Sequence, residues 1–169
     1  YMNNKWILQG GYHMVYNFNN WAGDIRIEYT AARPWTYTHR MPISAYTHNG
    51  RSLGFIHGPN SQLLTIENNL SINTRNRFKI TYGRLKFGEE PEKDKDDYDF
   101  GNDPNHNYDL DNPEYENSTG WLIGDIETTH NLQLLWEYQF SNIIGLELGF
   151  AHIKEMDERV NTFSIQVNV

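Results

Sequence analysis

The stretch that decides the fold is Asn131–Phe140, which reads Asn-Leu-Gln-Leu-Leu-Trp-Glu-Tyr-Gln-Phe. Its even-numbered positions are all apolar, and its odd-numbered positions are polar except for Leu135. Successive side chains of an extended chain point to opposite faces, so residues two apart share a face. The alternation therefore predicts a β-strand with one apolar and one polar face.

Two further segments, 143–151 and 162–169, repeat the alternation up to the last residue. Their apolar positions are Ile144, Leu146, Leu148, Phe150, Phe163, Ile165, Val167 and Val169. Strands of about ten residues, short turns and a polar face with glutamate and glutamine are typical of a transmembrane β-barrel. A soluble antiparallel sandwich also alternates, but its strands are usually shorter, about five or six residues.

Four earlier segments show the same pattern, at about 6–16, 25–30, 64–72 and 78–87. Short turns are expected at 17–21, 74–77 and 141–142, and long connections at 33–61 and 89–120. Because each strand reverses the chain, the long connections fall on one side and the short turns on the other, as in outer-membrane barrels. The expectation is an all-β, antiparallel transmembrane β-barrel. Its single region, residues 1–169, carries extracellular loops at about 33–61 and 89–120.

The number of predicted strands indicates that the barrel contains further strands outside this region. The patterns give about seven strands, whereas bacterial single-chain barrels have even numbers. An open sheet in lipid would also leave unpaired backbone groups at its edges. We therefore expect the region to be the C-terminal part of a larger barrel in the outer membrane.

Composition limits the other classes of protein. The 169 residues have a mean hydropathy of −0.74, and no run of about eighteen apolar residues could form a membrane helix. A net charge of −8 argues against nucleic acid as a partner. The absence of cysteine excludes disulfides and thiolate metal sites. The 14% aromatic content suits interfacial girdles and also surfaces that bind sugars.

The loop at 33–61 concentrates aromatic, basic and histidine side chains. Aromatic faces can stack on sugar rings, and arginine can donate two hydrogen bonds to the carboxylate of an acidic sugar. The predicted carbohydrate-binding residues are Arg33, Trp35, Tyr37, His39, Arg40, Tyr46, His48, Arg51 and His57. The same residues could instead fold the loop onto the barrel wall or plug the lumen. On the first interpretation, Trp35→Ala weakens polysaccharide retention and leaves stability nearly unchanged.

A short internal repeat occurs in this loop. Tyr37-Thr38-His39, Tyr46-Thr47-His48 and Phe55-Ile56-His57 follow one another nine residues apart. A nine-residue spacing gives three histidines no local ligand geometry, so we expect no metal site and no cofactor.

The chain from Glu28 to Ser61 resembles a stretch of the capsule-assembly Wzi family of Bacteroidota outer-membrane proteins, which includes the gliding-motility protein RemB. The resemblance lies in Glu28-Tyr29-Thr30, in Arg33-Pro34-Trp35-Thr36-Tyr37-Thr38-His39 and in Tyr46-Thr47-His48. A Gly- and Pro-containing segment that ends in Asn60 follows. Where the family tends to have Leu-Gly-His-Pro-Leu-Gly, this chain has Leu53-Gly54-Phe55-Ile56-His57-Gly58-Pro59. The resemblance implies a large outer-membrane barrel that binds surface polysaccharide in a lectin-like way.

One segment also resembles an enzyme active site. His48-Asn49-Gly50-Arg51-Ser52 resembles the active-site segment of outer-membrane phospholipase A, in which a serine lies two residues after the histidine. Here that position is Gly50, and without a nucleophile beside its base covalent hydrolysis cannot begin. We expect no catalytic residues.

The predicted function is therefore binding or assembly of surface (capsular) polysaccharide at the outer membrane. The partners are the polysaccharide, the lipid bilayer and other outer-membrane proteins. Two alternatives are the C-terminal barrel of an outer-membrane transporter and a soluble sugar-binding β-sandwich. The acidic loop at 89–120 lacks the spacing of a calcium-binding loop and is predicted to be solvated.

The alternation also predicts which way side chains face. Lipid-facing positions should be Leu134, Trp136, Leu146, Leu148, Ile165 and Val167. Glu137, Glu147 and Gln166 should face the lumen, where Glu67, Glu137, Glu147, Arg26 and Lys79 form a charge network. A one-residue slip in register would exchange every side chain between the two faces.

Overall fold

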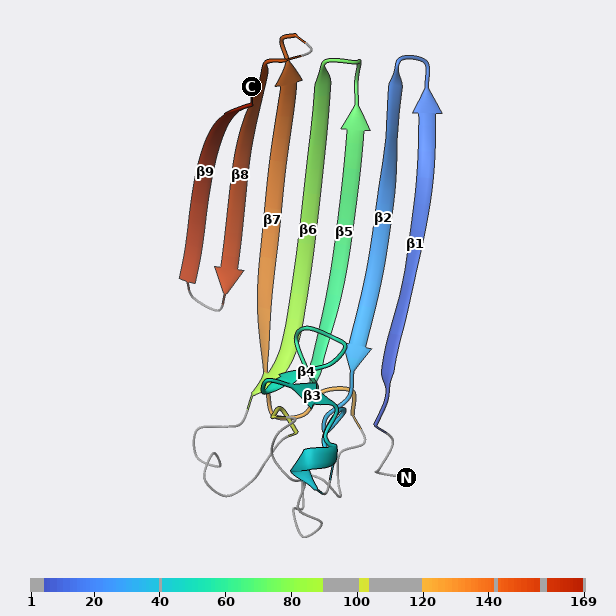
Figure 1. Ribbon diagram of the computed structural model, residues 1–169, viewed down its shortest axis with the longest axis vertical. Coiled ribbons are helices and arrows are strands. Elements are labelled where there is room, and N and C mark those ends of the chain that lie inside the picture. The colour runs from blue at the N-terminus through green and yellow to red at the C-terminus, as the bar shows by residue number, and fades with distance from the viewer. Residues whose placement is uncertain are drawn as a thin grey trace. The chain divides into compact units, whose positions relative to one another are not determined.

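A computed structural model describes residues 5–39, 41–89, 101–103, 120–141, 143–155 and 158–168 (Figure 1). The seven strands of its main sheet are β1 (Ile7–Phe18), β2 (Trp21–Ala32), β5 (Ser61–Ser71), β6 (Asn76–Glu89), β7 (Asp125–Gln139), β8 (Gly145–Glu155) and β9 (Glu158–Asn168). All seven predicted strands are confirmed. The predicted turn at 74–77 is displaced toward the N-terminus, because β5 ends at Ser71 and β6 begins at Asn76. Most of the acidic loop at 89–120 lies outside the described residues.

The main sheet is antiparallel and follows the chain, in the order β1-β2-β5-β6-β7-β8-β9. Sequential neighbours are therefore paired throughout, as in a meander. The sheet is open among the described residues, with β1 and β9 at its two edges (Figure 1). Three short elements lie between β2 and β5: the 3-10 helix η1 (Pro42–Ser44) and the strands β3 (Thr47–His48) and β4 (Arg51–Ser52).

The register of β7, β8 and β9 separates the two faces as the alternation predicted. Trp136 lies opposite Leu148, which lies opposite Ile165, and Leu146 lies opposite Val167. One residue further along each strand, Glu137, Glu147 and Gln166 form a polar row. Because adjacent residues of a strand point to opposite faces, one face is apolar and the other polar. The predicted partition is confirmed for these three strands.

The chain divides into two compact units. Unit 1 comprises Tyr1–Gln9, Thr30–Leu63 and Leu85–Thr128, and unit 2 comprises Gly10–Tyr29, Leu64–Arg84 and Thr129–Val169. Every buried residue of the described chain lies in unit 1, except for Gly145. The described part of unit 2 therefore has no buried side chain of its own, and large apolar side chains such as Phe163 (77% exposed) are open to their surroundings. None of the described helices is long and apolar enough to span a membrane.

Candidate functional site

The buried centre of unit 1 is built around Trp35, directly after β2. Trp35 is 2% exposed and has a positive φ of 55°. Its N–H donates to the Gly101 carbonyl over 3.0 Å, and its carbonyl accepts the Thr38 N–H (3.1 Å) and hydroxyl (2.7 Å). The indole therefore supports the loop from inside and offers no face to a sugar in this conformation. Trp35 is therefore not available as a sugar-binding residue, because an aromatic ring must be accessible to stack on a sugar.

Gly101 packs closely against Trp35 and also accepts its hydrogen bond. A Cβ added to Gly101 would lie 2.5 Å from the Trp35 nitrogen, and φ at Gly101 is +78°. Only glycine meets both requirements without strain. The contact ties the 101–103 segment, from within the predicted acidic loop, to the first long loop.

Asn60 is the second organising residue of unit 1. It is fully buried, with a φ of 53°. Its Nδ2 donates to the Gly88 carbonyl (3.1 Å), the Ile123 carbonyl (3.0 Å) and Asn102 Oδ1 (2.7 Å). Its Oδ1 accepts the Ile123 N–H over 3.0 Å, and its backbone carbonyl accepts the Gly88 N–H over 3.0 Å. One amide thus joins the end of β6 to two segments of the second long connection.

The exposed part of the loop is a small hairpin, β3–β4. Its two-residue turn is Asn49-Gly50, with φ values of 49° and 75°. Positive φ at both central positions is what a type I′ hairpin turn requires, and Asn-Gly is its preferred sequence. The register pairs His48 with Arg51 and Thr47 with Ser52.

The pairing continues one step beyond β3 and β4. The Leu53 N–H donates to the Tyr46 carbonyl over 3.0 Å. By strand alternation, one side of the hairpin presents Tyr46, His48, Arg51 and Leu53, and we name this set the hairpin face. Tyr46 is 61% exposed, Leu53 is 45% exposed, and His48 and Arg51 are exposed.

Tyr37 supports the hairpin face through contacts with Tyr46 and Phe55. Its ring stacks on Tyr46 with centroids 6.2 Å apart and planes 15° from parallel, and its carbonyl accepts the Tyr46 N–H over 2.9 Å. The Tyr37 hydroxyl accepts the Phe55 N–H over 2.6 Å. A Cβ on Gly54 would lie 2.6 Å from the Tyr37 hydroxyl, so the ring needs a glycine there. The nine-residue repeat of Tyr37, Tyr46 and Phe55 thus has a structural role, because Tyr37 contacts both of the other residues.

The remaining predicted residues do not join the hairpin face. The half-buried Arg33 contributes its carbonyl, which accepts the Thr36 and Asn60 N–H groups over 3.2 and 3.3 Å. His39 is exposed, and its Nδ1 accepts the Met41 N–H over 3.2 Å. Arg40 lies outside the described residues.

His57 lies edge-on to Phe55, with ring centroids 5.4 Å apart, and partial burial lowers its pKa below the usual value. A largely neutral His57 adds little charge at neutral pH. Nowhere in the described ranges do three metal-ligating side chains gather.

Lys5 fastens the segment before β1 to the same unit. Its Nζ donates to the Thr38 carbonyl over 3.1 Å and to the Thr38 hydroxyl over 2.8 Å. Burial lowers the pKa of Lys5 to about 8, because removing an ammonium from water disfavours its charged form. Near neutral pH this lysine still carries its charge, but by a smaller margin than an exposed lysine.

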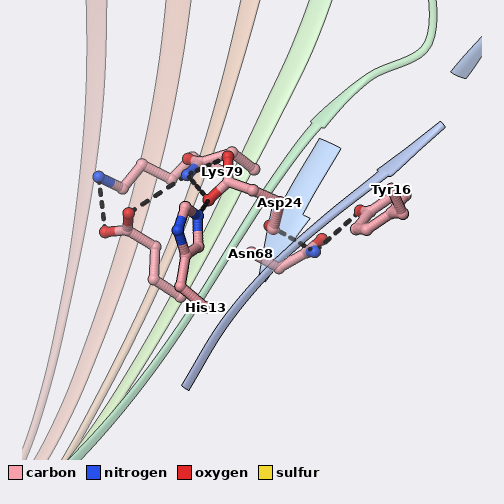
Figure 2. Close-up of polar contacts among 7 residues, drawn as sticks. His13, Tyr16, Asp24, Asn68 and Lys79 are labelled. Atoms are coloured by element: carbon pink, nitrogen blue, oxygen red, sulfur yellow. Dashed lines mark hydrogen bonds and ion pairs between the residues drawn. The ribbon is translucent and has the colours of Figure 1, made fainter. Parts of the chain in front are cut away.

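The polar face of unit 2 carries a connected network (Figure 2). Lys79 Nζ lies 2.8 Å from Glu67 Oε2, and Asn69 Nδ2 donates to Glu67 Oε1 and to Asp24 Oδ2, each over 3.2 Å. His13 Nε2 completes the network, 3.3 Å from Asp24 Oδ2. The Lys79–Glu67 pair confirms one part of the predicted charge network. Its members come from four adjacent strands, so the network braces the sheet.

Local sequence patterns pointed only weakly to the roles of Asn60, Gly101 and Leu53. Asn60 follows Gly58-Pro59, and asparagine is among the few residues that tolerate positive φ, so a turn could have been suspected. Its four side-chain hydrogen bonds depend on residues 28 to 63 positions away, which no local pattern reveals. Leu53 joins the hairpin face only because the Asn49-Gly50 turn fixes the register.

A scan against protein-family models, a search of curated proteins and a search of solved structures each found no match for this chain.

Proposed function

We propose that this chain is part of an outer-membrane β-barrel of the Wzi-like kind, and that it binds acidic surface polysaccharide through the hairpin face without catalysing a reaction. The observation that carries the proposal is the composition of this face. An exposed tyrosine ring, itself stacked on Tyr37, lies beside a histidine and an arginine that are paired across the hairpin. A sugar ring can stack on Tyr46, and the Arg51 guanidinium can hold a carboxylate in two hydrogen bonds.

The proposal favours acidic over neutral sugars. Arg51 is exposed and lies directly opposite His48, so any positive charge on His48 adds to that of Arg51. No acidic residue belongs to the hairpin face, although the chain as a whole has a net charge of −8. A local cationic face on an acidic protein favours an anionic ligand at that face.

A membrane location is supported by unit 2. The strands of the main sheet, of which unit 2 holds the larger part, run 11–15 residues, and about 9–11 tilted residues suffice to cross the hydrocarbon core of a bilayer. The apolar row Leu134–Phe150–Phe163 crosses three strands and is 40% exposed at Leu134 and 77% exposed at Phe163. Such a surface is costly in water and suited to lipid.

Strand parity supports completion of the barrel by further strands. In an antiparallel sheet of seven strands, the two edge strands run in the same direction. β1 and β9 cannot then close the sheet on themselves in antiparallel fashion, and an odd number of additional strands is required. Each unpaired edge in lipid would leave several backbone groups without partners, at several kcal/mol per group. We infer that the closed barrel contains an even number of strands, seven of them described here.

The test measures binding of two soluble probes, polygalacturonate (acidic) and dextran (neutral), to the purified protein, with the strands that complete its barrel, in detergent. We expect Tyr46→Ala to weaken polygalacturonate binding about tenfold, since ring stacking and its buried area contribute about 1–2 kcal/mol. Arg51→Gln should remove the preference for the acidic probe. Ser52→Ala, on the opposite side of the hairpin, is the matched control and should change neither affinity. Unchanged binding in both Tyr46→Ala and Arg51→Gln, with folding intact, would remove the hairpin face from the site.

The same preparation discriminates the other classes. A chain that stays monodisperse without detergent would indicate a soluble sandwich, in which a second layer covers the apolar face. A folded, membrane-inserted chain that binds neither probe would leave a transporter barrel as the better description.

A further inference from the structure

Basic side chains form a row across β7, β8 and β9. The observed register sets His130 opposite Lys154 and Lys154 opposite Arg159, and we name these three residues the basic row. Lys154 lies four positions after Phe150 in β8, and Arg159 lies four positions before Phe163 in β9. Residues an even number of positions apart in a strand share a face. The basic row therefore lies on the apolar face of the sheet.

The acidic side chains of the same strands lie on the other face. The paired residues 129–139, 145–155 and 158–168 include four acidic residues, which are Glu137, Glu147, Glu155 and Glu158. Glu155 directly follows Lys154, and Glu158 directly precedes Arg159, so alternation separates the two signs of charge. Among the described residues, no carboxylate pairs with Lys154 or Arg159, and both side chains are exposed. Their charges are open to a ligand on the apolar face.

The basic row begins where the apolar positions end. In β7 and the residue after it, the apolar positions run from Leu132 to Phe140, nine residues, about the length with which a tilted strand crosses the hydrocarbon core of a bilayer. His130 is the next position on this face. In β8 and β9, His152 and Asn161 lie between the apolar rows and the basic row, with Nδ1 and Oδ1 2.7 Å apart. The face thus changes from apolar through polar to cationic along the strands.

We propose that the basic row binds the phosphate group of an anionic phospholipid. A guanidinium and an ammonium on adjacent strands can both donate hydrogen bonds to phosphate oxygens. A soluble acid would gain from these charges alone, whereas an amphiphile also gains from the exposed apolar side chains of the same face, such as Phe163 and Ile165. The alkyl chains of lysine and arginine can lie along apolar surface while the charged groups reach a headgroup. Clusters of basic residues next to membrane-spanning segments are a recurrent form of site for anionic headgroups.

This inference rests on the proposed membrane location of unit 2 and adds a preference for a class of lipid. The experiment reconstitutes the protein, with the strands that complete its barrel, into phosphatidylcholine vesicles with and without phosphatidylglycerol. After extraction in mild detergent, native mass spectrometry counts the lipids that stay bound. We expect phosphatidylglycerol to be retained in preference to phosphatidylcholine. Lys154→Gln and Arg159→Gln should each weaken its retention about fivefold, because each removes one of the two fixed charges.

Two variants control for the loss of charge. Lys154→Arg keeps the charge and should retain phosphatidylglycerol like the wild type. Arg77→Gln removes one positive charge from the other face, since Arg77 directly precedes Phe78, whose ring stacks on Trp136. Its retention of phosphatidylglycerol should therefore equal that of the wild type. All these positions are exposed, so the substitutions should leave the protein folded.

The outcomes distinguish this site from the function on which it rests. Inserted protein that retains both lipids equally, or that loses phosphatidylglycerol as much in Arg77→Gln as in Arg159→Gln, overturns the lipid site and leaves polysaccharide binding standing. Weaker polygalacturonate binding by Lys154→Gln, with lipid retention unchanged, also overturns it and assigns the basic row to the polysaccharide. A protein that does not enter vesicles at all overturns the lipid site together with the membrane location.

Discussion

Replacing Asn60 tests whether one buried amide organises unit 1. Asn60→Gly keeps the positive φ without strain and removes the whole side chain. The Gly88 and Ile123 carbonyls then lose a donor, and the Ile123 N–H loses its acceptor. Each buried group left unsatisfied costs about 1–3 kcal/mol, and partial rescue by water reduces the sum. We expect Asn60→Gly to lower the free energy of unfolding by about 2–5 kcal/mol.

Asn60→Ala adds the cost of a left-handed backbone, which is about 1–2 kcal/mol for a residue with a Cβ. That cost can be measured separately at Asn49, which has nearly the same φ (49° against 53°) but is exposed. Asn49→Ala should therefore cost only about 1–2 kcal/mol. The difference between the two alanine variants gives the contribution of the Asn60 side chain.

Asn60→Asp is the sharpest of the three substitutions, because it keeps the shape and changes one donor group into an acceptor. A carboxylate there would face the Gly88 carbonyl, the Ile123 carbonyl and Asn102 Oδ1 with only one donor available. A buried, unpaired charge is strongly unfavourable, and breaking a buried pair typically costs about 3–5 kcal/mol. Part of the loss should be recovered at low pH, where the introduced carboxyl is protonated.

The assay is denaturant unfolding combined with amide hydrogen exchange. In Asn60→Gly, protection should fall at the Ile123 amide, which donates to the Asn60 side-chain oxygen that the substitution removes. It should be unchanged at Leu53, whose partner is the Tyr46 carbonyl. An unfolding free energy within about 0.5 kcal/mol of wild type, as for an ordinary surface substitution, would refute the reasoning.

Three other predictions concern single residues of the two units. Leu146→Arg should cost about 2–4 kcal/mol in a bilayer, whereas Gln166→Arg on the polar face should cost little, as measured by unfolding from vesicles. Gly101→Ala should destabilise unit 1 more than Gly50→Ala in thermal unfolding. The two glycines have nearly the same φ, +78° and +75°, but only at Gly101 would an added Cβ have other atoms within 4 Å. Because the pKa of Lys5 is lowered to about 8 from 10.5, the unfolded chain binds more protons between these pH values, and stability should rise with pH across that window. Lys5→Met should flatten this rise relative to wild type, and identical slopes in the two proteins would contradict it.

The strands were predictable because their cause is local. Alternation along Asn131–Phe140 fixes which side chains share a face, and the observed register sets Glu137 opposite Glu147 and Trp136 opposite Leu148. Neither pairing requires knowledge of the rest of the chain beyond a short turn. The displaced turn between β5 and β6 is also local: Asn73 caps it by accepting three hydrogen bonds, which places the turn earlier than the apolar pattern suggested.

The interior of the first loop was not predictable in the same way. Trp35 was among the predicted sugar-binding residues, yet it is 2% exposed because Gly101, 66 positions later, packs against it. Its burial reverses the expected effect of Trp35→Ala: the substitution should lower the unfolding free energy by about 3–5 kcal/mol, as for other buried tryptophans. Unchanged heat stability in this variant would contradict the observed packing.

Unit 1 and unit 2 obtain their stability in different ways, and this difference bears on function. The core of unit 1 is partly polar, and Asn60 and Thr38 are buried there with hydrogen bonds satisfied inside the unit. Such a core holds its shape by directional contacts and keeps the hairpin face in one arrangement. The described part of unit 2 buries no side chain, so its apolar rows must gain their free energy from what surrounds the sheet. If the surroundings are lipid, as we propose, a substitution such as Leu146→Arg acts through the bilayer, whereas Asn60→Gly acts through hydrogen bonds. Changing the bilayer thickness should therefore alter the cost of the first substitution and leave that of the second unchanged.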